Sequence, residues 1–225
     1  MTKIIALSGK KASGKSTSCE FIRKSYIQAF KYYNENGVAP DEICIYNFAD
    51  ELKNIAVNML GLPANLVYGS QADKETLTSI RGRDLYEFSK TLYRLSSTHP
   101  LERFTYLREN DSLSVRDVLK LLGNFMRCLN VDCWINSVLH KIRQENPKVA
   151  LIGDCRFSSE AIKIKQNGGY VIRLTRHIDN DQDVSEVDLD NYTEFDEVIE
   201  NHEMSLDERN ECLNEFMMER ILKPY

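Results

Sequence analysis

Patterns that identify several common classes of protein are missing from this chain. Its 225 residues contain no apolar run that approaches the length of a membrane-spanning helix. Basic residues are not in surplus, since 29 Lys and Arg face 34 Asp and Glu for a net charge of -5. A nucleic-acid-binding protein usually shows the opposite balance. The sequence therefore argues against a membrane protein and against a nucleic-acid partner, although a local basic pocket can still hold a small anion.

Closely paired cysteines are also missing. The chain has no CxxC spacing, so a zinc site built from such pairs is not indicated. The opening residues, MTKIIALSG, are too short for a secretory signal peptide. We therefore predict reduced, mostly buried thiols in a cytoplasmic protein. The six cysteines are Cys19, Cys44, Cys128, Cys133, Cys155 and Cys212.

Strand-like and helix-like stretches alternate along the chain. Short runs rich in β-branched residues predict strands, and apolar residues at helical spacing predict helices that end at glycine or proline. This alternation predicts an α/β protein with helices on both faces of a mostly parallel sheet. The strands are predicted at 3–9, 43–49, 149–154, 170–174 and 196–201, and the helices at 14–33, 50–60, 114–126, 132–144, 158–167 and 206–221.

We expect a single domain over residues 1–225 that contains two less regular segments. Residues 65–111 are polar and charge-mixed, and they are predicted to form a partly helical insertion. Residues 175–192 are acidic and are predicted to form a lid-like loop. Ser114 and Asp117 have the spacing of a capping box, with Asp in place of the usual Glu or Gln.

The stretch LSGKKASGKST matches the phosphate-binding pattern G-x-x-x-x-G-K-[ST] in full at Gly9, Gly14, Lys15 and Ser16. Glycines let the backbone curl so that N–H groups point at phosphate oxygens, and the following helix N-terminus adds partial positive charge. Lys15 is expected to neutralise the β- and γ-phosphates, and Ser16 to place its hydroxyl on Mg²⁺. A chance glycine–lysine turn is the alternative. The other loop residues expected at the nucleotide are Lys11, Ala12, Ser13 and Thr17.

A second chemical signal is the acid that ends the run VALIGD. P-loop proteins often need another carboxylate beside the metal at the end of an apolar strand, and Asp154 has that place. Arg156 follows two residues later and could stabilise the charge on a transferring phosphoryl group. The alternative is an acid at a helix N-terminus paired with a neighbouring arginine.

Further charged residues are candidates for a second ligand. Asp50 follows the strand-like run YNFA, and Lys53 lies one helical turn later; a helix cap and a solvated lysine are the alternative. Arg116 and Arg127 belong to one predicted helix and could bind an acceptor phosphate or stay solvated. Arg176 follows the run YVIRLT and could stack on a base or close over phosphates.

Absent motifs and the chain length narrow the class of P-loop protein. A switch GTPase would need an N-K-x-D guanine motif, which the chain does not contain. A motor or helicase would normally be longer and carry additional nucleotide-coupling motifs. Small P-loop kinases of nucleotides and metabolites fit a length of 225 residues.

Several stretches together resemble the bacteriophage deoxynucleoside monophosphate kinases. The P-loop is shared by very many families, but the combination of the later stretches is much more specific. The resemblance covers most of the chain, except residues 65–111. In chain order the stretches are LSGKKASGKST, NFADELKNIA, SVRDVLKLLGNFMR, DCWINS, LIGDCRFSSEAIKIKQNGGYVIRLTR and VSEVDLD with FDEVIEN.

This resemblance implies a P-loop NTPase-type fold with three α/β/α layers and transfer of the γ-phosphate of ATP to a deoxynucleoside monophosphate. It implies Mg²⁺ as the metal, a phage-encoded enzyme in the host cytoplasm, and small-molecule substrates. Related enzymes are often dimeric, so a homodimer is one possibility, and the oligomeric state is left open. The bases that the enzyme accepts are left open.

The resemblance also assigns expected roles to single residues. Asp50 and Lys53 would border the monophosphate site, and Trp134, otherwise a core candidate, lies in the matching stretch DCWINS. Arg116 and Arg127 would approach the acceptor phosphate.

The remaining expected roles concern the donor side. Lys15, Asp154 and Arg156 would act on the transferring group, together with Arg127. Ser16 and Asp154 would hold the metal, and Arg176 would belong to the closing loop.

Two other interpretations remain open at this point. The chain could be a P-loop kinase for another small acceptor, such as dephospho-coenzyme A. It could also be a nucleotide-binding module without catalysis, although such a module would need only some of the four residues Lys15, Ser16, Asp154 and Arg156.

Overall fold

A computed structural model describes residues 2–33, 42–83, 85, 112–176 and 187–222 of the protein. The chain divides into two compact units. One, here called the sheet unit, comprises Met1–Phe48 and Ile135–Tyr225. The other, called the helical unit, comprises Ala49–Trp134.

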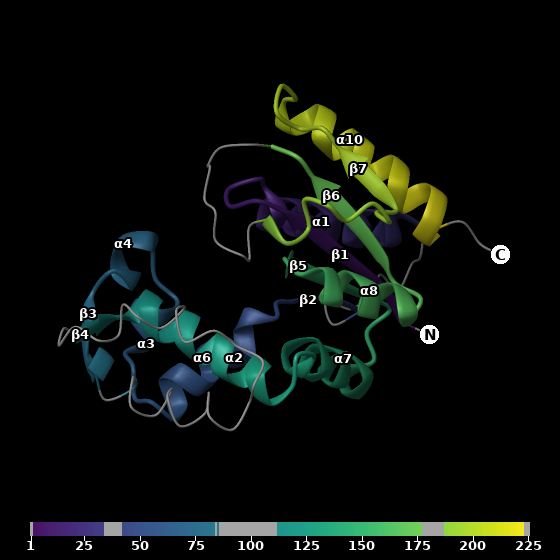
Figure 1. The fold of residues 1–225 in the computed structure, drawn as a ribbon. Coiled ribbons are helices and arrows are strands. Elements are labelled where there is room, and N and C mark those ends of the chain that lie inside the picture. The colour runs from purple at the N-terminus through teal and green to yellow at the C-terminus, as the bar shows by residue number, and fades with distance from the viewer. Residues whose placement is uncertain (1, 34–41, 84, 86–111, 177–186, 223–225) are drawn as a thin grey trace. The chain divides into compact units, whose positions relative to one another are not determined.

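A five-stranded parallel sheet forms the centre of the sheet unit (Figure 1). The strand order is β2-β5-β1-β6-β7, and each neighbouring pair is parallel, which confirms the predicted α/β class. The elements of this unit are the strands β1 (Lys3–Gly9), β2 (Ile43–Tyr46), β5 (Val149–Cys155), β6 (Tyr170–Leu174) and β7 (Glu197–Ile199), and the helices α1 (Lys15–Tyr33), α7 (Cys133–Glu145, which begins at the end of the helical unit), α8 (Ser158–Gln166) and α10 (Leu206–Met217).

Helices cover both faces of the sheet, as the apolar strand sequences require. Strands β1 and β5 are buried along nearly their whole length, because a parallel sheet of this kind has no solvent-facing side. On one face, Ile5 and Leu7 pack in a core with Ile22 of α1 and Leu213 of α10. The alternation of side chains along β1 turns Ile4 to the other face, where Ile164 of α8 is buried.

The helical unit is built around α6 (Val115–Leu129). Its other elements are α2 (Ala49–Asn58), α3 (Ala64–Val67), α4 (Gln71–Lys74) and the antiparallel pair of β3 (Leu77–Arg81) with β4 (Ser112–Ser114). A separate apolar core holds these elements together. It contains Ala56, Leu62, Val67, Leu113, Val115, Val118 and Leu121.

The observed helix ends agree with the predictions at one position and differ from them at two others. The predicted capping box is confirmed, since Ser114 Oγ accepts from the Asp117 backbone N–H and the Asp117 carboxylate accepts from the Ser114 N–H. The predicted cap at Asp50 is wrong, because α2 begins at Ala49 and Asp50 lies within its first turn. The last helix is α10 followed by a π-helical segment, Met218–Leu222, rather than one α-helix to residue 221.

Part of the segment predicted as an insertion is described, and it belongs to the helical unit. Strand β3 was not predicted, because its exposed, short sequence LTSIR carries a weak pattern and its partner β4 lies about thirty residues later. Residues 86–111 lie outside the described residues, so the role of the insertion stays a prediction. Within the described part of the chain, no helix combines the length and apolarity needed to cross a membrane.

The core of the helical unit gives a test of the fold. Leu121 is 1% exposed and Leu129 is 75% exposed, although both belong to α6. Leu121→Ala should lower the free energy of unfolding by about 2–5 kcal/mol because it leaves a cavity. Leu129→Ala should change it by less than about 0.5 kcal/mol.

Urea unfolding followed by tryptophan fluorescence measures this difference, because the single tryptophan, Trp134, is buried in the same unit. Equal effects of the two substitutions would contradict the packing described for α6.

Candidate functional site

The loop between β1 and α1 has an unusual backbone. Gly9, Ala12 and Gly14 have φ angles of 151°, 59° and 95°, in the region that side chains disfavour. A Cβ atom at Gly9 would lie 2.4 Å from Ser13 Oγ and 2.7 Å from the Leu174 carbonyl oxygen. Glycine is therefore required at position 9, and the loop takes the curled form that the sequence pattern predicts.

The side chain of Lys15 lies inside this curl. Its ammonium group donates to the Gly9 carbonyl oxygen at 2.6 Å and to the Lys10 carbonyl oxygen at 2.7 Å. Lys15 is 8% exposed, which is low for a lysine. The loop therefore places a positive charge at its centre, held by its own carbonyl oxygens.

Asp154 lies at the end of β5, the strand next to β1. Its Oδ1 accepts from the Phe48 backbone N–H at 2.7 Å, which fixes the carboxylate. Burial raises the pKa of the Cys19 thiol to about 12, and the negative charge of Asp154 adds to this rise while Lys15 opposes it. The register of β1 with β5 pairs Ser8 with Cys155, so Asp154 and the loop that carries Lys15 follow from the same end of two neighbouring strands.

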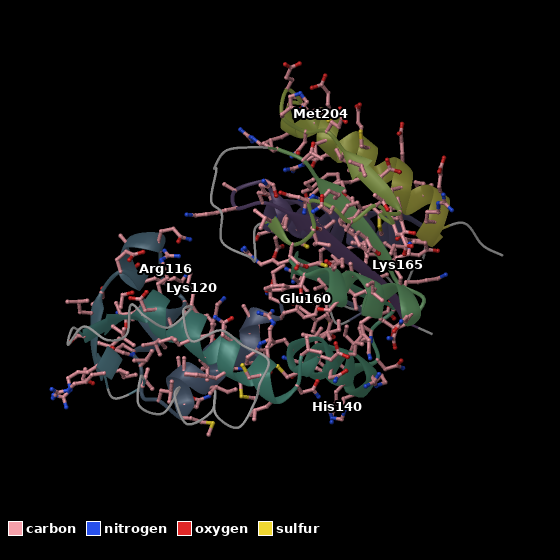
Figure 2. All side chains as sticks on the ribbon, in the orientation of Figure 1. Arg116, Lys120, His140, Glu160, Lys165 and Met204 are labelled. Carbon is pink, nitrogen blue, oxygen red and sulfur yellow. The ribbon has the colours of Figure 1, made fainter. Side chains whose placement is uncertain are left out.

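The turn after Asp154 is fixed by a buried acid. The Glu160 carboxylate accepts from the backbone N–H groups of Arg156 and Phe157 at 2.9 and 3.1 Å. Glu160, labelled in Figure 2, is 4% exposed. These bonds cap the start of α8 and set the position of Arg156, whose half-buried side chain stays a predicted catalytic group.

Asp190 connects the strand ends beside the loop. Its carboxylate pairs with Lys10 at 3.1 Å and with Arg173 at 2.8 Å. Arg173 also donates to Ser8 Oγ at 2.9 Å, which follows from the β1–β6 register that places Ser8 opposite Arg173. Sequence reasoning missed Arg173, because an arginine inside the apolar run YVIRL carries no motif.

Part of the predicted lid-like loop is described. Asp188 accepts from both the backbone N–H and the hydroxyl of Ser158, each at 2.6 Å, so this end of the loop is docked on the start of α8. Residues 177–186 lie outside the described residues, and the closing role of the loop stays a prediction.

Asn201 is a second residue that the sequence did not reveal. Its amide nitrogen donates to the Ser13 carbonyl oxygen at 3.0 Å, and its amide oxygen accepts from the Arg176 backbone N–H at 2.9 Å. Asn201 is buried and follows β7 by two residues. It therefore fixes the position of Arg176, whose side chain is exposed, relative to the curled loop.

A separate group of cations lies in the helical unit. Burial lowers the pKa of Lys74, and the positive charges of Lys53 and Arg116 lower it further. Arg116 donates to Gln71 Oε1 at 2.6 Å and pairs with Glu75. Figure 2 shows Arg116 at the N-terminal end of α6, near α4. The charges of the predicted residues Lys53 and Arg116 thus both act on Lys74, a residue that the sequence analysis did not name.

Asp50 and Arg127, the other charged residues predicted at the acceptor, do not belong to this group of cations. Burial raises the pKa of Tyr68, and the charge of Asp50 adds to it, so Asp50 lies near Tyr68, whose ring also contacts Lys53. Arg127 follows Arg116 by eleven residues, about 16 Å along one helix. A shared acceptor phosphate for these two arginines stays a prediction.

Trp134 is 5% exposed, and its indole N–H donates to the Gly123 carbonyl oxygen. This burial fits its interpretation as a core residue. A role for Trp134 in binding stays a prediction.

Ser16 and Asp154 are the predicted metal ligands beside the loop. Among the residues that the structure describes, no group of three or more His, Cys, Asp or Glu could hold a metal ion. Ser16 is exposed, and Asp154 is half-buried. In phosphate sites Mg²⁺ keeps several waters and takes its other oxygens from substrate phosphates.

Comparison with known proteins adds one relative. No protein-family model matches the chain. The chain is similar to a protein of Acanthamoeba polyphaga mimivirus that is described as "Putative deoxynucleotide monophosphate kinase". The two are 26% identical over 207 residues, which cover 88% of each chain. A match of this extent does not come from the P-loop alone.

The buried thiols give a test of the site's packing. All six cysteines are free; Cys19 and Cys155 are buried, whereas Cys128 is exposed. Burial raises the pKa of both buried thiols, so they stay protonated at pH 8 and do not form the reactive thiolate. Iodoacetamide should therefore modify Cys128 first and reach Cys19 and Cys155 only after unfolding.

Peptide mass spectrometry at successive times measures these rates. Modification of Cys19 in the folded protein at the rate of Cys128 would contradict the packing of α1 against β5.

Proposed function

We propose that the protein is an ATP-dependent phosphotransferase that converts deoxynucleoside monophosphates to diphosphates for DNA precursor synthesis. The observation that carries the proposal is the curled G-x-x-x-x-G-K-S loop with Lys15 at its centre and Asp154 on the neighbouring strand. The description of the mimivirus relative supports the same type of reaction.

The curled loop is the proposed site of the donor, ATP. Lys15 would exchange the carbonyl oxygens of Gly9 and Lys10 for oxygens of the β- and γ-phosphates. Backbone N–H groups of residues 11–17 would bind the same phosphates, and the N-terminus of α1 would favour their charge. Ser16 and Asp154 would hold Mg²⁺, which when bound neutralises phosphate charge.

The reaction needs positioning and charge more than acid–base chemistry. A phosphate oxygen of the acceptor is already a nucleophile, so no strong general base is required. It forms a bond to the γ-phosphorus as the bond to the β–γ bridging oxygen breaks, and ADP leaves. Lys15 and Arg156 would stabilise the charge that spreads over the equatorial oxygens.

The cations of the helical unit are the proposed site of the acceptor's phosphate. Burial is the main cause of the lowered pKa of Lys74, and the positive charges of Lys53 and Arg116 add to it. A phosphate dianion would favour the charged form of Lys74. Asp50, Arg127 and Trp134 are the candidates for the rest of the acceptor. Arg176 is the candidate for a donor contact from the closing loop.

Acceptor-dependent ADP release tests the proposal directly. ATP and Mg²⁺ would be mixed with dGMP, dTMP, dCMP, hydroxymethylated dCMP or dAMP separately, beside the ribonucleotides. Release with one or more deoxynucleotides is expected and identifies the bases. ATP binding without release under any of them would instead favour another acceptor, such as dephospho-coenzyme A, or a module without catalysis.

Lys15→Ala should lower kcat by about 10²–10³-fold or more while the protein stays folded, because it removes charge from the transferring phosphates. Lys24→Ala is the matched control, since Lys24 is an exposed lysine of α1. Steady-state ADP release measures both variants. Unchanged turnover in Lys15→Ala would refute the assignment of the loop.

Lys74→Met should raise the KM for the acceptor about tenfold and leave the KM for ATP unchanged, because a charged hydrogen-bond partner of the phosphate is lost. Lys141→Met, at an exposed position of α7, removes the same charge elsewhere. An acceptor KM that stays at the wild-type value in Lys74→Met would exclude this cation group as the phosphate site.

A further inference from the structure

Arg209 in the first turn of α10 is a buried cation beside the curled loop. It is 4% exposed. A Cβ atom at Gly14 would lie 2.7 Å from its Nη1, so the guanidinium group lies directly against the loop. No motif of the sequence drew attention to this residue, since it lies in the charged helix LDERNECLNEFM.

Within the described part of the chain, the groups around Arg209 do not neutralise its charge. Its Nη2 donates to the amide oxygen of Asn210 at 2.9 Å, whereas its buried Nε has no hydrogen-bond partner there. Burial lowers the pKa of Arg209, and among the described residues the positive charge of Arg176, another cation, lowers it further. The nearby acid Glu208 is occupied in capping α10 at Ser205.

A buried cation without a counter-charge is costly to the folded protein. Helix α10 cannot easily move Arg209 into solvent, because its residues Leu213 and Phe216 are packed in the core. Asn201 also ties the segment before α10 to Ser13 in the loop. The structure thus holds the guanidinium group at the loop in spite of the cost.

None of the described residues supplies a counter-charge to Arg209, and an anion bound at the loop would supply one. We propose that Arg209 binds the polyphosphate chain of the nucleotide held by the loop, with Arg176 as its second cation. This inference rests on the nucleotide-binding part of the proposed function, but it does not depend on which acceptor is used. It makes Arg209 a donor-binding residue contributed by the last helix of the chain.

Arg209→Met separates a binding role from a structural one, because the two predict opposite effects on the free protein. Removal of an uncompensated buried charge should leave the unfolding midpoint of the free protein unchanged or raise it. The Kd for Mg²⁺-ATP should rise about tenfold, since a hydrogen bond to a charged group is lost. The Kd for inorganic triphosphate should rise by the same factor, and that for adenosine should not change.

Titration calorimetry and thermal unfolding measure these quantities without any acceptor. Arg220→Met is the matched control, because Arg220 is an exposed arginine that follows α10, and it should match wild type in every assay. Arg209→Lys should retain more triphosphate affinity than Arg209→Met, since it keeps the charge but loses the planar fork.

Three results would overturn the proposed role of Arg209, and each has a different meaning. A lower unfolding midpoint with unchanged triphosphate affinity would make Arg209 a structural residue and overturn the proposal. Weaker binding of adenosine but not of triphosphate would also overturn it, because the contact would then be to the nucleoside. Wild-type protein that binds neither ATP nor triphosphate would overturn both this inference and the proposed function, whereas binding without phosphoryl transfer would affect the proposed function alone.

Discussion

The hydrogen bonds from the Lys15 ammonium to the carbonyl oxygens of Gly9 and Lys10 define the geometry on which the rest of the site depends. They need a chain that turns sharply at the end of β1, which glycine at position 9 permits. Burial of a lysine ammonium group is costly unless oxygen atoms accept its hydrogen bonds. In the proposed complex, phosphate oxygens take the place of these carbonyl oxygens at the Lys15 ammonium group.

The position of β1 inside the sheet brings the other groups to the loop. Its neighbour β5 carries Asp154, and its neighbour β6 carries Arg173, which reaches Ser8. Asn201, after β7, joins the loop from farther along the sheet. Because the carboxyl ends of parallel strands lie at one edge, residues from four parts of the sequence meet there. The site is thus a consequence of topology, and the core packing of the sheet stabilises it.

Sequence reasoning predicted the parts of this protein that have strong local patterns. The apolar runs of β1 and β5, the glycine–lysine loop and the Ser114–Asp117 cap all depend on residues close together in the chain. The sequence did not reveal three residues whose partners lie far away in the chain, namely Arg173, Asn201 and Arg209. The residues next to an isolated arginine or asparagine do not indicate a long-range contact. The pairing of β3 with β4 was missed for the same reason. Whether Arg156 and Arg127 act on the substrate stays a prediction.

We propose that the curl at Gly9 forms the nucleotide site, and the affinity of Gly9→Ala for Mg²⁺-ATP is the decisive measurement. A Cβ atom there would lie 2.7 Å from a backbone oxygen of β6, which cannot move easily. Gly168→Ala is the control, because Gly168 also has a positive φ, but no atom of the described residues lies within 4 Å of where its Cβ would be. We expect Gly9→Ala, shown to be folded by circular dichroism, to lose at least about tenfold in ATP affinity, and Gly168→Ala to bind ATP like wild type. Equal ATP affinity in Gly9→Ala and wild type would contradict it.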